Sequence, residues 1–356
     1  MSSSKNNRLL VFLKDKKKKS YFKIIKECLY LWVTKKEIPF YYFKHLYKKE
    51  VTNYKDYLST KECAKIQFNK KFHKKELVEL IANKLTFSIY CSKNNLPVPK
   101  LISYNLSSCF FYDSIAYPIN NIDELKIFLN LVFSKSKHNS VFIKPLSLFG
   151  GTGCFKISKE TLDEDLKESS DYIINNSCIH EEVVEQHNLI NQIHSKCINT
   201  IRIETYIDKK GEIHLLSSYM RFGVGTSHVD NSHAGGFYVS IDLESGKLKE
   251  KGMTLMEYGS DAIFYHPDSG FVFKDFKIPY LDEICELIIK ATTSIPGRYI
   301  GWGIAISENS PVIIEANDLT SVSGADLAYG GYKKKPVFKE ILEETKDTDL
   351  KNAYKI

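Results

Sequence analysis

Residues 141–157 read VFIKPLSLFGGTGCFKI and join two short apolar runs through a glycine-rich segment. The runs at 141–143 and 154–157 predict two strands, with Lys144 at the end of the first. The glycine loop between them contains Gly150, Gly151 and Gly153. Glycine lets backbone N–H groups approach phosphate oxygens closely, and a lysine facing such a loop supplies positive charge. The stretch therefore predicts a polyphosphate site, with an ordinary glycine hairpin as the alternative when this motif is taken alone.

Two other phosphate-binding motifs are absent from the sequence. No Gly-x-x-x-x-Gly-Lys-Ser/Thr run occurs, and a strand instead of a helix follows the glycines, so the glycine loop is not a P-loop. A Gly-x-Gly-x-x-Gly dinucleotide fingerprint is also missing.

Two further segments carry polar groups at strand ends. Glu315 and Asn317 end an apolar strand, and a period of two places both side chains on one face, where two oxygen donors could hold Mg²⁺ between phosphates. Residues 178–185 begin apolar and become acidic, as a hinge beside an adenine and its ribose would. The alternatives are a solvated strand end for the first and an ordinary edge strand for the second.

Alternating periodicity predicts an α+β fold with mostly antiparallel sheets. The side chains of 201–207 alternate strictly, and a turn at 208–211 leads into a second strand. Further predicted strands cover 213–221, 237–242, 301–306 and 312–316, and an amphipathic helix covers 279–295.

Charge is distributed unevenly along the 356 residues, whose net charge is +7. Residues 1–80 hold 21 Lys and Arg against 8 Asp and Glu, which gives +13, and aromatic residues are interleaved with the lysines. Such a segment suits the interface of an anionic membrane. It equally suits a helical cap whose aromatics pack on the main body while its lysines face water. Nothing in it matches a nucleic-acid reading motif, so we expect no nucleic-acid partner.

The composition predicts a cytoplasmic protein with reduced thiols. No apolar run reaches the roughly 18 to 20 residues of a membrane helix, and Leu9–Leu13 is too short for the apolar region of a signal peptide. The eight cysteines are scattered, without a Cys-x-x-Cys pair. Free, mostly buried thiols are therefore expected.

The order of the motifs resembles the ATP-grasp superfamily, and in particular the sugar-transfer-associated ATP-grasp proteins found with polysaccharide genes. The resemblance covers about residues 80–330 and rests on motifs that are each weak alone. In chain order they are Asn83-Lys84, Asn95 to Pro99, Ile143-Lys144-Pro145 with the glycine loop, Glu181 to His187, Asn199 to Arg202, Met220 to Gly223, Val229 to Asn231 with Gly235-Gly236, Gly301 to Gly303, and Glu315 to Asn317.

The resemblance implies an ATP-grasp fold, in which two α+β subdomains clasp ATP. We expect a basic, mainly helical region over 1–80, a subdomain with the phosphate loop and adenine hinge over 81–187, and a subdomain with the metal and substrate sites over 188–340. Residues 341–356 are expected to form a tail.

The resemblance also implies which residues hold the nucleotide. Lys84 and Lys144 would contact the α- and β-phosphates, with the glycine loop closing over them. The adenine would be bound mainly through the backbone of Glu182, Val183 and Val184. Glu185 would meet the ribose hydroxyls.

By the same resemblance, Glu315 and Asn317 would bind Mg²⁺. Arg202 and Arg221 match arginines that face the reacting phosphoryl and carboxyl groups in related amino-acid ligases, a task that suits the planar guanidinium fork. The alternative for each arginine is a surface salt bridge. Together with Lys144 they form the predicted catalytic set, and Lys144→Ala is expected to abolish turnover while leaving the fold intact.

One position departs from the family pattern. Members usually carry an acidic metal ligand where this chain has Gly303, and losing a carboxylate should weaken metal binding. Asp318 or Asp326 could compensate from the neighbouring loop, or catalysis could be impaired.

The loop from Gly225 to Gly236 is predicted to recognise substrate. A zinc site there is disfavoured because the loop offers no cysteine. His228 or Asp230 is a candidate proton acceptor for an attacking amine. The predicted substrate-binding residues are Asn199, His228, Asp230, Asn231, Gly235 and Gly236.

The function expected from this reading is an ATP- and Mg²⁺-dependent carboxylate-amine ligase that forms an amide through an acylphosphate. Its partners would be a sugar carboxylate, either free or lipid-linked, and an amine, in capsule or O-antigen polysaccharide synthesis. A regulatory nucleotide-binding protein with impaired catalysis and an ATP-grasp phosphotransferase stay open as alternatives. The expected location is the cytoplasm, with peripheral membrane contact through residues 1–80 left open.

Overall fold

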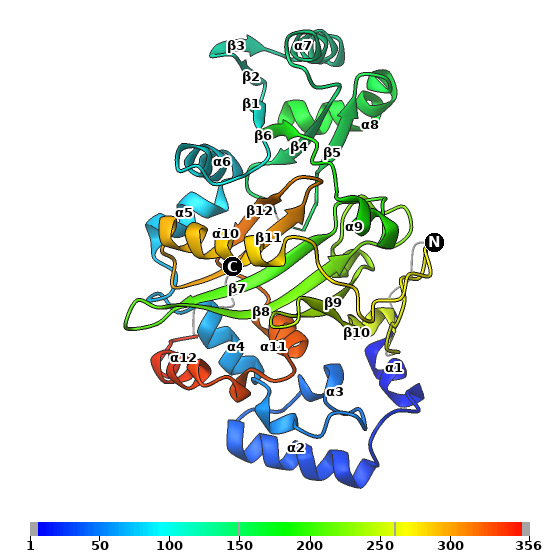
Figure 1. The fold of residues 1–356 in the computed structure, drawn as a ribbon, viewed down its shortest axis with the longest axis vertical. Helices are drawn as coiled ribbons and strands as arrows, with labels where there is room; N and C mark the ends of the chain where they lie inside the picture. The colour runs from blue at the N-terminus through cyan, green and yellow to red at the C-terminus, as the bar shows by residue number, and fades with distance from the viewer. Residues whose placement is uncertain (1–5, 149, 260, 351–356) are drawn as a thin grey trace.

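The N-terminal sheet forms the upper lobe of the molecule (Figure 1) and has the strand order β3-β2-β1-β6-β4-β5, with every neighbouring pair antiparallel. The structure is a computed structural model that describes residues 6–148, 150–259 and 261–350. The strands of this sheet are β1 (Leu101–Leu106), β2 (Cys109–Tyr112), β3 (Ile115–Pro118), β4 (Ser140–Pro145), β5 (Phe155–Ser158) and β6 (Cys178–Glu182). Helices α7 (Ile122–Lys135) and α8 (Leu162–Asn175) pack their apolar sides against the sheet in one core.

The C-terminal sheet has the order β10-β9-β8-β7-β11-β12 and is also antiparallel throughout. Its strands are β7 (Thr200–Ile207), β8 (Ile213–Phe222), β9 (Phe237–Asp242), β10 (Lys247–Thr254), β11 (Tyr299–Ile306) and β12 (Pro311–Asn317). Helices cover both of its faces. Because side chains alternate along a strand, Ile201 and Ile203 of β7 enter one core while Tyr206 enters the other.

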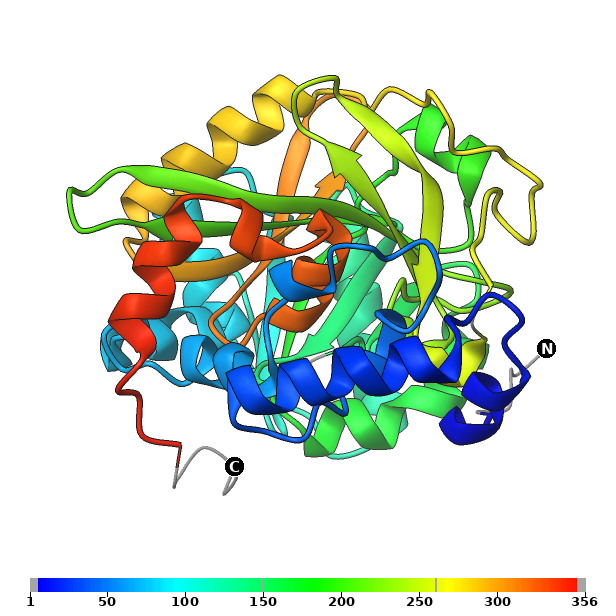
Figure 2. The same ribbon diagram turned by 90° about the horizontal axis from the view of Figure 1, so that it is seen from below.

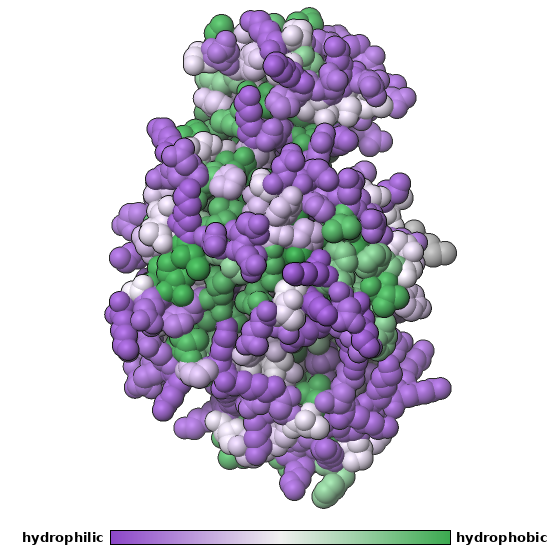
Figure 3. Space-filling view, in the orientation of Figure 1, coloured by the Kyte–Doolittle hydropathy of each residue, from purple (hydrophilic) through white to green (hydrophobic). Residues whose placement is uncertain are grey.

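The two faces of the C-terminal sheet recruit helices from distant parts of the chain. The core around Ile203 is shared by α5 (Lys75–Ala82), α6 (Lys84–Lys93), α9 (Asn188–Ile193) and α10 (Leu281–Ser294). The core around Tyr206 is shared by α4 (Thr60–Gln67), α11 (Val322–Tyr329), η4 (Tyr332–Lys334) and α12 (Val337–Thr345). Two further short turns are η2 (Ser232–Ala234) and η3 (Met256–Tyr258). In Figure 3 the hydrophobic residues visible on this side of the molecule lie mainly at the level of this sheet.

The first part of the chain forms a separate small core beneath the C-terminal sheet. Its elements are α1 (Arg8–Lys14), α2 (Tyr21–Lys35), α3 (Tyr42–His45) and η1 (Tyr54–Asp56). A buried ion pair joins Lys19 Nζ to Glu27 Oε2 at 2.6 Å, and Tyr42 donates to the same oxygen at 2.6 Å. In the view from below, α2 lies across the outer surface of the molecule (Figure 2).

Most of the predicted elements are present, and the expected division of the chain into regions stays a prediction. The strands predicted at 201–207, 213–221 and 237–242 are β7, β8 and β9, and the helix predicted at 279–295 is α10. Helix α5 crosses residue 80 and α12 crosses residue 340. Ile66 and Phe72 share a core with the C-terminal sheet, so that the 58–82 segment packs with the C-terminal subdomain. Residues 351–356 of the expected tail lie outside the described residues.

Two expectations from composition can be compared directly with the structure. All eight cysteines are free thiols, four of them buried. Among the described residues, no helix has both the length and the apolar character needed to cross a membrane.

Candidate active site

A cavity of about 1390 Å³ lies where the two sheets face one another, and most of the predicted site residues line it. Those from the N-terminal side are Lys84, Lys144, Gly150, Gly151, Glu182, Val183 and Val184. Those from the C-terminal side are Arg202, Arg221, His228, Asp230, Asn231, Glu315 and Asn317. Five predicted site residues are not part of the lining: Gly153, Glu185, Asn199, Gly235 and Gly236.

Lys144 lies at the end of β4 and is held by a carboxylate of the neighbouring strand. Its Nζ is 2.6 Å from Glu181 Oε2 of β6, and both side chains are buried. Burial alone would lower the pKa of Lys144, but the ion pair with Glu181 outweighs burial and raises it. Lys144 is therefore a fixed cation in the cavity wall.

Lys84 approaches the same region from the start of α6. Asn83 caps that helix by accepting from the backbone N–H groups of Leu85 and Thr86. Lys84 Nζ donates to the carbonyl of Leu148, which precedes the glycine loop, at 2.5 Å. Burial lowers the pKa of Lys84.

The glycine loop packs against the loop that follows β8. Gly150 and Gly151 have φ values of +71° and +78°, a backbone conformation that favours glycine. Asn231 Nδ2 donates to the Gly150 carbonyl at 3.0 Å, and a Cβ placed on Gly151 would come within 2.4 Å of Val229. The loop of one subdomain thus closes directly on a loop of the other.

The predicted adenine hinge follows the end of β6 in the N-terminal sheet. Glu182 ends β6, and its Oε1 accepts from the backbone N–H of Lys100 at 3.0 Å. Val183 and Val184 follow where the pairing with β4 has ended, and both line the cavity. Glu185 is exposed and lies outside the lining.

Arg202, Gly303 and Glu315 form one row across three neighbouring strands. In the register of the sheet, Gly303 of β11 is paired with Arg202 of β7 on one side and with Glu315 of β12 on the other. Arg202 Nη2 reaches Glu315 Oε1 at 2.5 Å, and Arg221 Nη2 lies 3.8 Å from the same oxygen. Burial would raise the pKa of Glu315, but the two arginines lower it to about 2, so this carboxylate stays ionised.

Arg221 belongs to a second set of contacts on the same side. Its Nε and Nη2 donate to Thr200 Oγ1 at 3.0 and 2.6 Å, and Nη2 lies 3.2 Å from Asp230 Oδ1. Thr200 in turn donates to Asp230 through its backbone N–H and its hydroxyl. Burial would lower the pKa of Arg221, but Asp230 and Glu315 raise it.

The side chains proposed to compensate for Gly303 do not face the cavity. Asp326 is buried beneath the sheet, where it accepts from the backbone N–H groups of Leu58 and Tyr332 at 2.9 and 2.6 Å. Asp318 is not part of the cavity lining either. The acids that do line the cavity beside β11 are Glu315 and Asp230.

Asn199, Gly235 and Gly236 shape loops behind the cavity. Asn199 Nδ2 donates to Gln186 Oε1 and to the His194 carbonyl, and its Oδ1 accepts from the Gly223 N–H. A Cβ on Gly236 would come within 2.6 Å of the Phe222 carbonyl. Gly235 ends η2 with φ of +94°. Their predicted contact with substrate stays a prediction.

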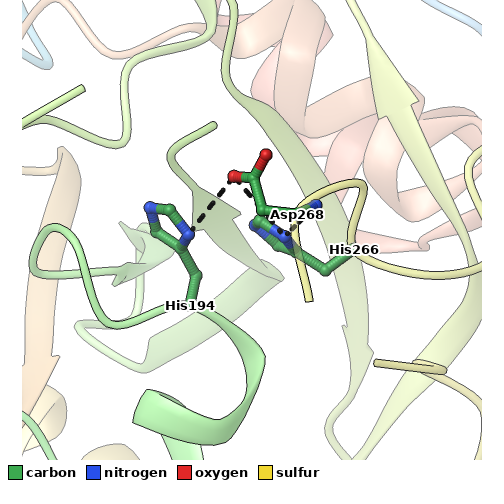
Figure 4. Close-up of side chains that lie close together, drawn as sticks. All are labelled: His194, His266 and Asp268. Atoms are coloured by element: carbon green, nitrogen blue, oxygen red, sulfur yellow. Dashed lines mark hydrogen bonds and ion pairs between the residues drawn. The ribbon is translucent and has the colours of Figure 1, made fainter. Parts of the chain in front are cut away.

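A cluster of His194, His266 and Asp268 lies next to this loop region (Figure 4). Asp268 Oδ2 is 3.6 Å from His194 Nδ1 and 4.0 Å from His266 Nδ1, and the Gly225 N–H donates to it at 2.6 Å. The imidazole rings stack with centroids 4.7 Å apart and planes 19° apart. In nearly parallel rings the in-plane lone pairs point side by side and do not converge, so we assign no metal to this cluster.

Two residues that hold the site together were not among the predicted set. Glu181 faces Lys144 because it pairs in register with Phe142, which lies on the same face of β4. Thr200 shares a face of β7 with Arg202 through the period of two, and that periodicity is a signal that could have identified it.

The chain was compared with known proteins. A family model for sugar-transfer associated ATP-grasp proteins matches residues 64–339. No curated protein matches significantly. Three solved structures resemble the fold with a TM-score of 0.44 each: D-alanyl-alanine synthetase A from Vibrio cholerae, N5-carboxyaminoimidazole synthetase from Staphylococcus aureus complexed with ADP, and a biotin carboxylase–ATP complex from Campylobacter jejuni.

These structures are 10%, 12% and 10% identical to the chain and cover 76%, 74% and 76% of it. The alignments cover 66%, 52% and 46% of the solved chains, so this chain spans less than two thirds of their lengths.

Proposed function

The chain belongs to the sugar-transfer-associated ATP-grasp family, and we propose that it is an ATP-dependent ligase that joins a carboxylate to an amine. The observation that carries this proposal is the meeting of four cationic side chains with the ionised Glu315 in one cavity. Those cations are Lys84, Lys144, Arg202 and Arg221. Fixed cations of this kind stabilise polyphosphate and the charge that develops during acyl transfer.

ATP would lie between the two subdomains. Val183 and Val184 would meet the adenine through their backbone, and the two lysines would meet the α- and β-phosphates. The contact between Asn231 and Gly150 supports closure of the glycine loop over the phosphates, because it ties that loop to the opposite subdomain. Closure of this kind excludes water from a reactive intermediate.

The residues at the end of β12 fit a magnesium ion. Glu315 is ionised, and the side chain of Asn317 interacts with its carboxylate and helps to lower its pKa. Both side chains line the cavity, so a carboxylate and an amide are available to one ion there. Carboxylate and amide oxygens are ligands that Mg²⁺ accepts, together with water and phosphate. When bound there, the ion would neutralise charge on the transferring phosphoryl group.

The proposed reaction has two steps. A carboxylate oxygen of the substrate attacks the γ-phosphorus of ATP, the bond to the β,γ-bridging oxygen breaks, and an acylphosphate and ADP result. An amine then attacks the acyl carbon, loses a proton and expels phosphate, which leaves an amide. Arg221, oriented by Thr200 and Asp230, would hold the carboxylate and stabilise the oxyanion of the second step.

The substrate class follows from the family's association with sugar transfer. We propose a uronic acid as the carboxylate and an amino acid as the amine, or the reverse, in a capsule or O-antigen polysaccharide. His228 and Asn231 line the cavity and would contact the amine.

A second candidate function is a nucleotide-binding regulatory protein with impaired turnover. Gly303 favours it, because this position faces Glu315 in register and supplies no side chain for a metal. A phosphotransferase would differ from both in its product.

Calorimetry with ATP, with and without Mg²⁺, tests the proposal on wild type and Glu315→Gln. We expect magnesium-dependent binding in wild type, loss of that dependence in Glu315→Gln, and wild-type behaviour in Glu308→Ala, which removes an exposed acid from the turn between β11 and β12. Absence of ATP binding by the folded wild type would overturn the nucleotide assignment.

Turnover separates the remaining candidates. ADP release should require both a uronic acid and an amine, and the product mass should equal their sum minus water. A gain of phosphate would instead identify a phosphotransferase. Nucleotide binding without ADP release across a panel of uronic acids and amines would favour the regulatory function.

A further inference from the structure

The outer face of α2 is apolar, which is unusual for a helix on the surface of a globular protein. Phe22, Ile25, Leu29, Trp32 and Val33 follow one another at steps of 3, 4, 3 and 1 residues, so they form one stripe along the helix. All five are exposed, with Phe22 at 81%, Val33 at 75% and Trp32 at 53% of their full accessible surface.

The opposite face of the same helix is already packed. Ile24 and Leu31 are buried in the small N-terminal core, and Glu27 pairs with the buried Lys19. The helix is thus fixed with its second apolar stripe turned away from the protein. Packing within the described part of the chain does not account for that stripe.

The exposed apolar surface continues beyond α2. Leu9, Leu10 and Leu13 of α1 are exposed, as are Ile38 and Phe40 after α2. In both ribbon views α1 lies beyond one end of α2 (Figures 1 and 2). The side view in Figure 3 sees only the edge of this surface, where green residues appear at the bottom of the molecule. We call the exposed face of α1, α2 and residues 38–40 the outer face.

Positive charge surrounds the outer face. Residues 8–36 contain ten Lys and Arg against two Asp and Glu, and both acids are buried. Lys23 and Lys26 flank the stripe on α2 and are exposed. Aromatic and aliphatic side chains bordered by lysines match the boundary between headgroups and acyl chains of an anionic bilayer.

The charge also argues against a second copy of the chain as the occupant. A two-fold contact through this face would place two strongly basic surfaces against each other, where like charges repel. An anionic lipid surface supplies the complementary sign.

We propose that the outer face docks on an anionic membrane. The apolar stripe enters the headgroup region, and the surrounding lysines meet lipid phosphates or carboxylates. A stripe of five large side chains bordered by several lysines matches a reversible peripheral contact, to which the apolar side chains and the lysines both contribute.

The active-site cavity extends as far as one of the helices that carry the outer face. Arg8, at the start of α1, lines that cavity, and its guanidinium pairs with Glu257 through Nε and Nη2 at 3.1 and 3.0 Å. If the proposed ligase function is correct, the carboxylate or the amine is therefore presented on a lipid-linked glycan. Vesicle binding itself does not depend on that function.

Co-sedimentation of the full chain with vesicles tests the proposal. We expect the wild type to pellet with vesicles of phosphatidylcholine and phosphatidylglycerol, to stay in solution with phosphatidylcholine alone, and to dissociate as salt rises. The double variant Phe22→Gln/Val33→Gln should bind at least tenfold more weakly. Ile127→Gln, which removes a residue of α7 that is 70% exposed at the opposite end of the molecule, should bind like the wild type.

Two further measurements keep the outcome decisive. Circular dichroism establishes that the variants fold, and ATP calorimetry separates a failure of docking from a failure of the nucleotide assignment. Wild-type vesicle binding by the folded double variant would overturn the proposal. So would a wild type that ignores anionic vesicles and sediments as a dimer that the double variant dissociates, because a second copy would then cover the outer face.

Discussion

Arg202 of β7 and Glu315 of β12 form an ion pair across β11, the strand that lies between them. They can meet because the intervening residue of β11 is Gly303, which has no side chain. The guanidinium and the carboxylate meet at 2.5 Å, and a Cβ on residue 303 would come within 2.8 Å of Glu315 Cγ. Glycine at this position therefore permits the bridge, and it leaves Glu315 beside two arginines without a second acid on β11. Family members usually carry an acidic metal ligand at residue 303. In this chain the two arginines balance the charge of Glu315 beside that position.

Restoring an acid at residue 303 should strengthen metal binding. Gly303→Asp adds a carboxylate next to Glu315, and the flexible Glu315 side chain can shift to accommodate it. We expect the affinity for Mg²⁺ in the presence of ADP to rise roughly tenfold, or about 1.4 kcal/mol. Calorimetry measures this change, and Gly303→Asn is the control of the same shape without the charge. Equal Mg²⁺ affinity in the two variants would contradict the metal assignment at β12.

We expect Lys144 to contribute to stability as well as to the site, because it is buried in an ion pair with Glu181. Removing Lys144 would strand the buried Glu181, and an unpaired buried charge typically costs about 3–5 kcal/mol of folding free energy. Lys144→Ala should therefore lower the free energy of unfolding by about that amount. Urea unfolding of the ligand-free protein measures the change.

A second substitution separates the two roles of Lys144. In Lys144→Ala/Glu181→Gln the stranded charge is removed, so we expect most of the lost stability to return. ATP affinity should stay low, because the cation at the phosphates is still missing. Recovery of ATP binding together with stability would exclude Lys144 from the nucleotide site.

Local patterns in the sequence were sufficient to predict the elements that build the site. The alternation in 201–207 reflects the two cores on the faces of β7, and the apolar run before Glu315 is β12. The basic β10 was missed because four of its eight residues are charged and only two are buried. Strands with apolar residues on at least one face, such as β7 and β11, were therefore predicted, whereas a strand as rich in charge as β10 was not.

Side-chain contacts that depend on the register of strand pairing could not be predicted from the sequence. Lys144 and Glu181 are far apart along the chain, and only the pairing of β4 with β6 brings them to one face. The same holds for Asn199. Its motif predicted a substrate contact, but its side-chain amide forms hydrogen bonds within the loop behind the cavity. On α2 the sequence contains two apolar stripes, and only the packing of Leu31 decides which of them faces outward.

The glycine loop provides a test with a matched control. Gly151→Ala forces an L-residue into a positive φ and brings its Cβ against Val229, whereas Gly211→Ala imposes a similar φ of +88° in open space. Both should cost about 1 kcal/mol of stability from the backbone. Only Gly151→Ala should weaken ATP binding, by about tenfold or more, because it displaces the loop. Calorimetry and thermal unfolding measure the two effects, and equal ATP affinities for the two variants would argue against closure of this loop on phosphate.

Asp326 predicts how stability depends on pH. This carboxyl joins the segment at Leu58 to the turn at Tyr332, and burial raises its pKa from 3.8 to about 7 in spite of the two backbone N–H groups that donate to it. The folded state then binds a proton between pH 4 and 7 that the unfolded state releases. By linkage, the contribution of Asp326 to stability is largest at low pH and falls as pH rises through 7.

Asp326→Asn should remove this dependence while keeping the shape of the side chain. The amide is expected to destabilise the protein at every pH, because its NH₂ group cannot accept from a backbone N–H. The stability difference between wild type and Asp326→Asn should therefore shrink between pH 5 and pH 8, by a few kcal/mol at most. Taking the difference cancels groups that titrate in both proteins, including Glu315. Urea unfolding at several pH values measures it, and a constant difference would place the pKa of Asp326 near its ordinary value.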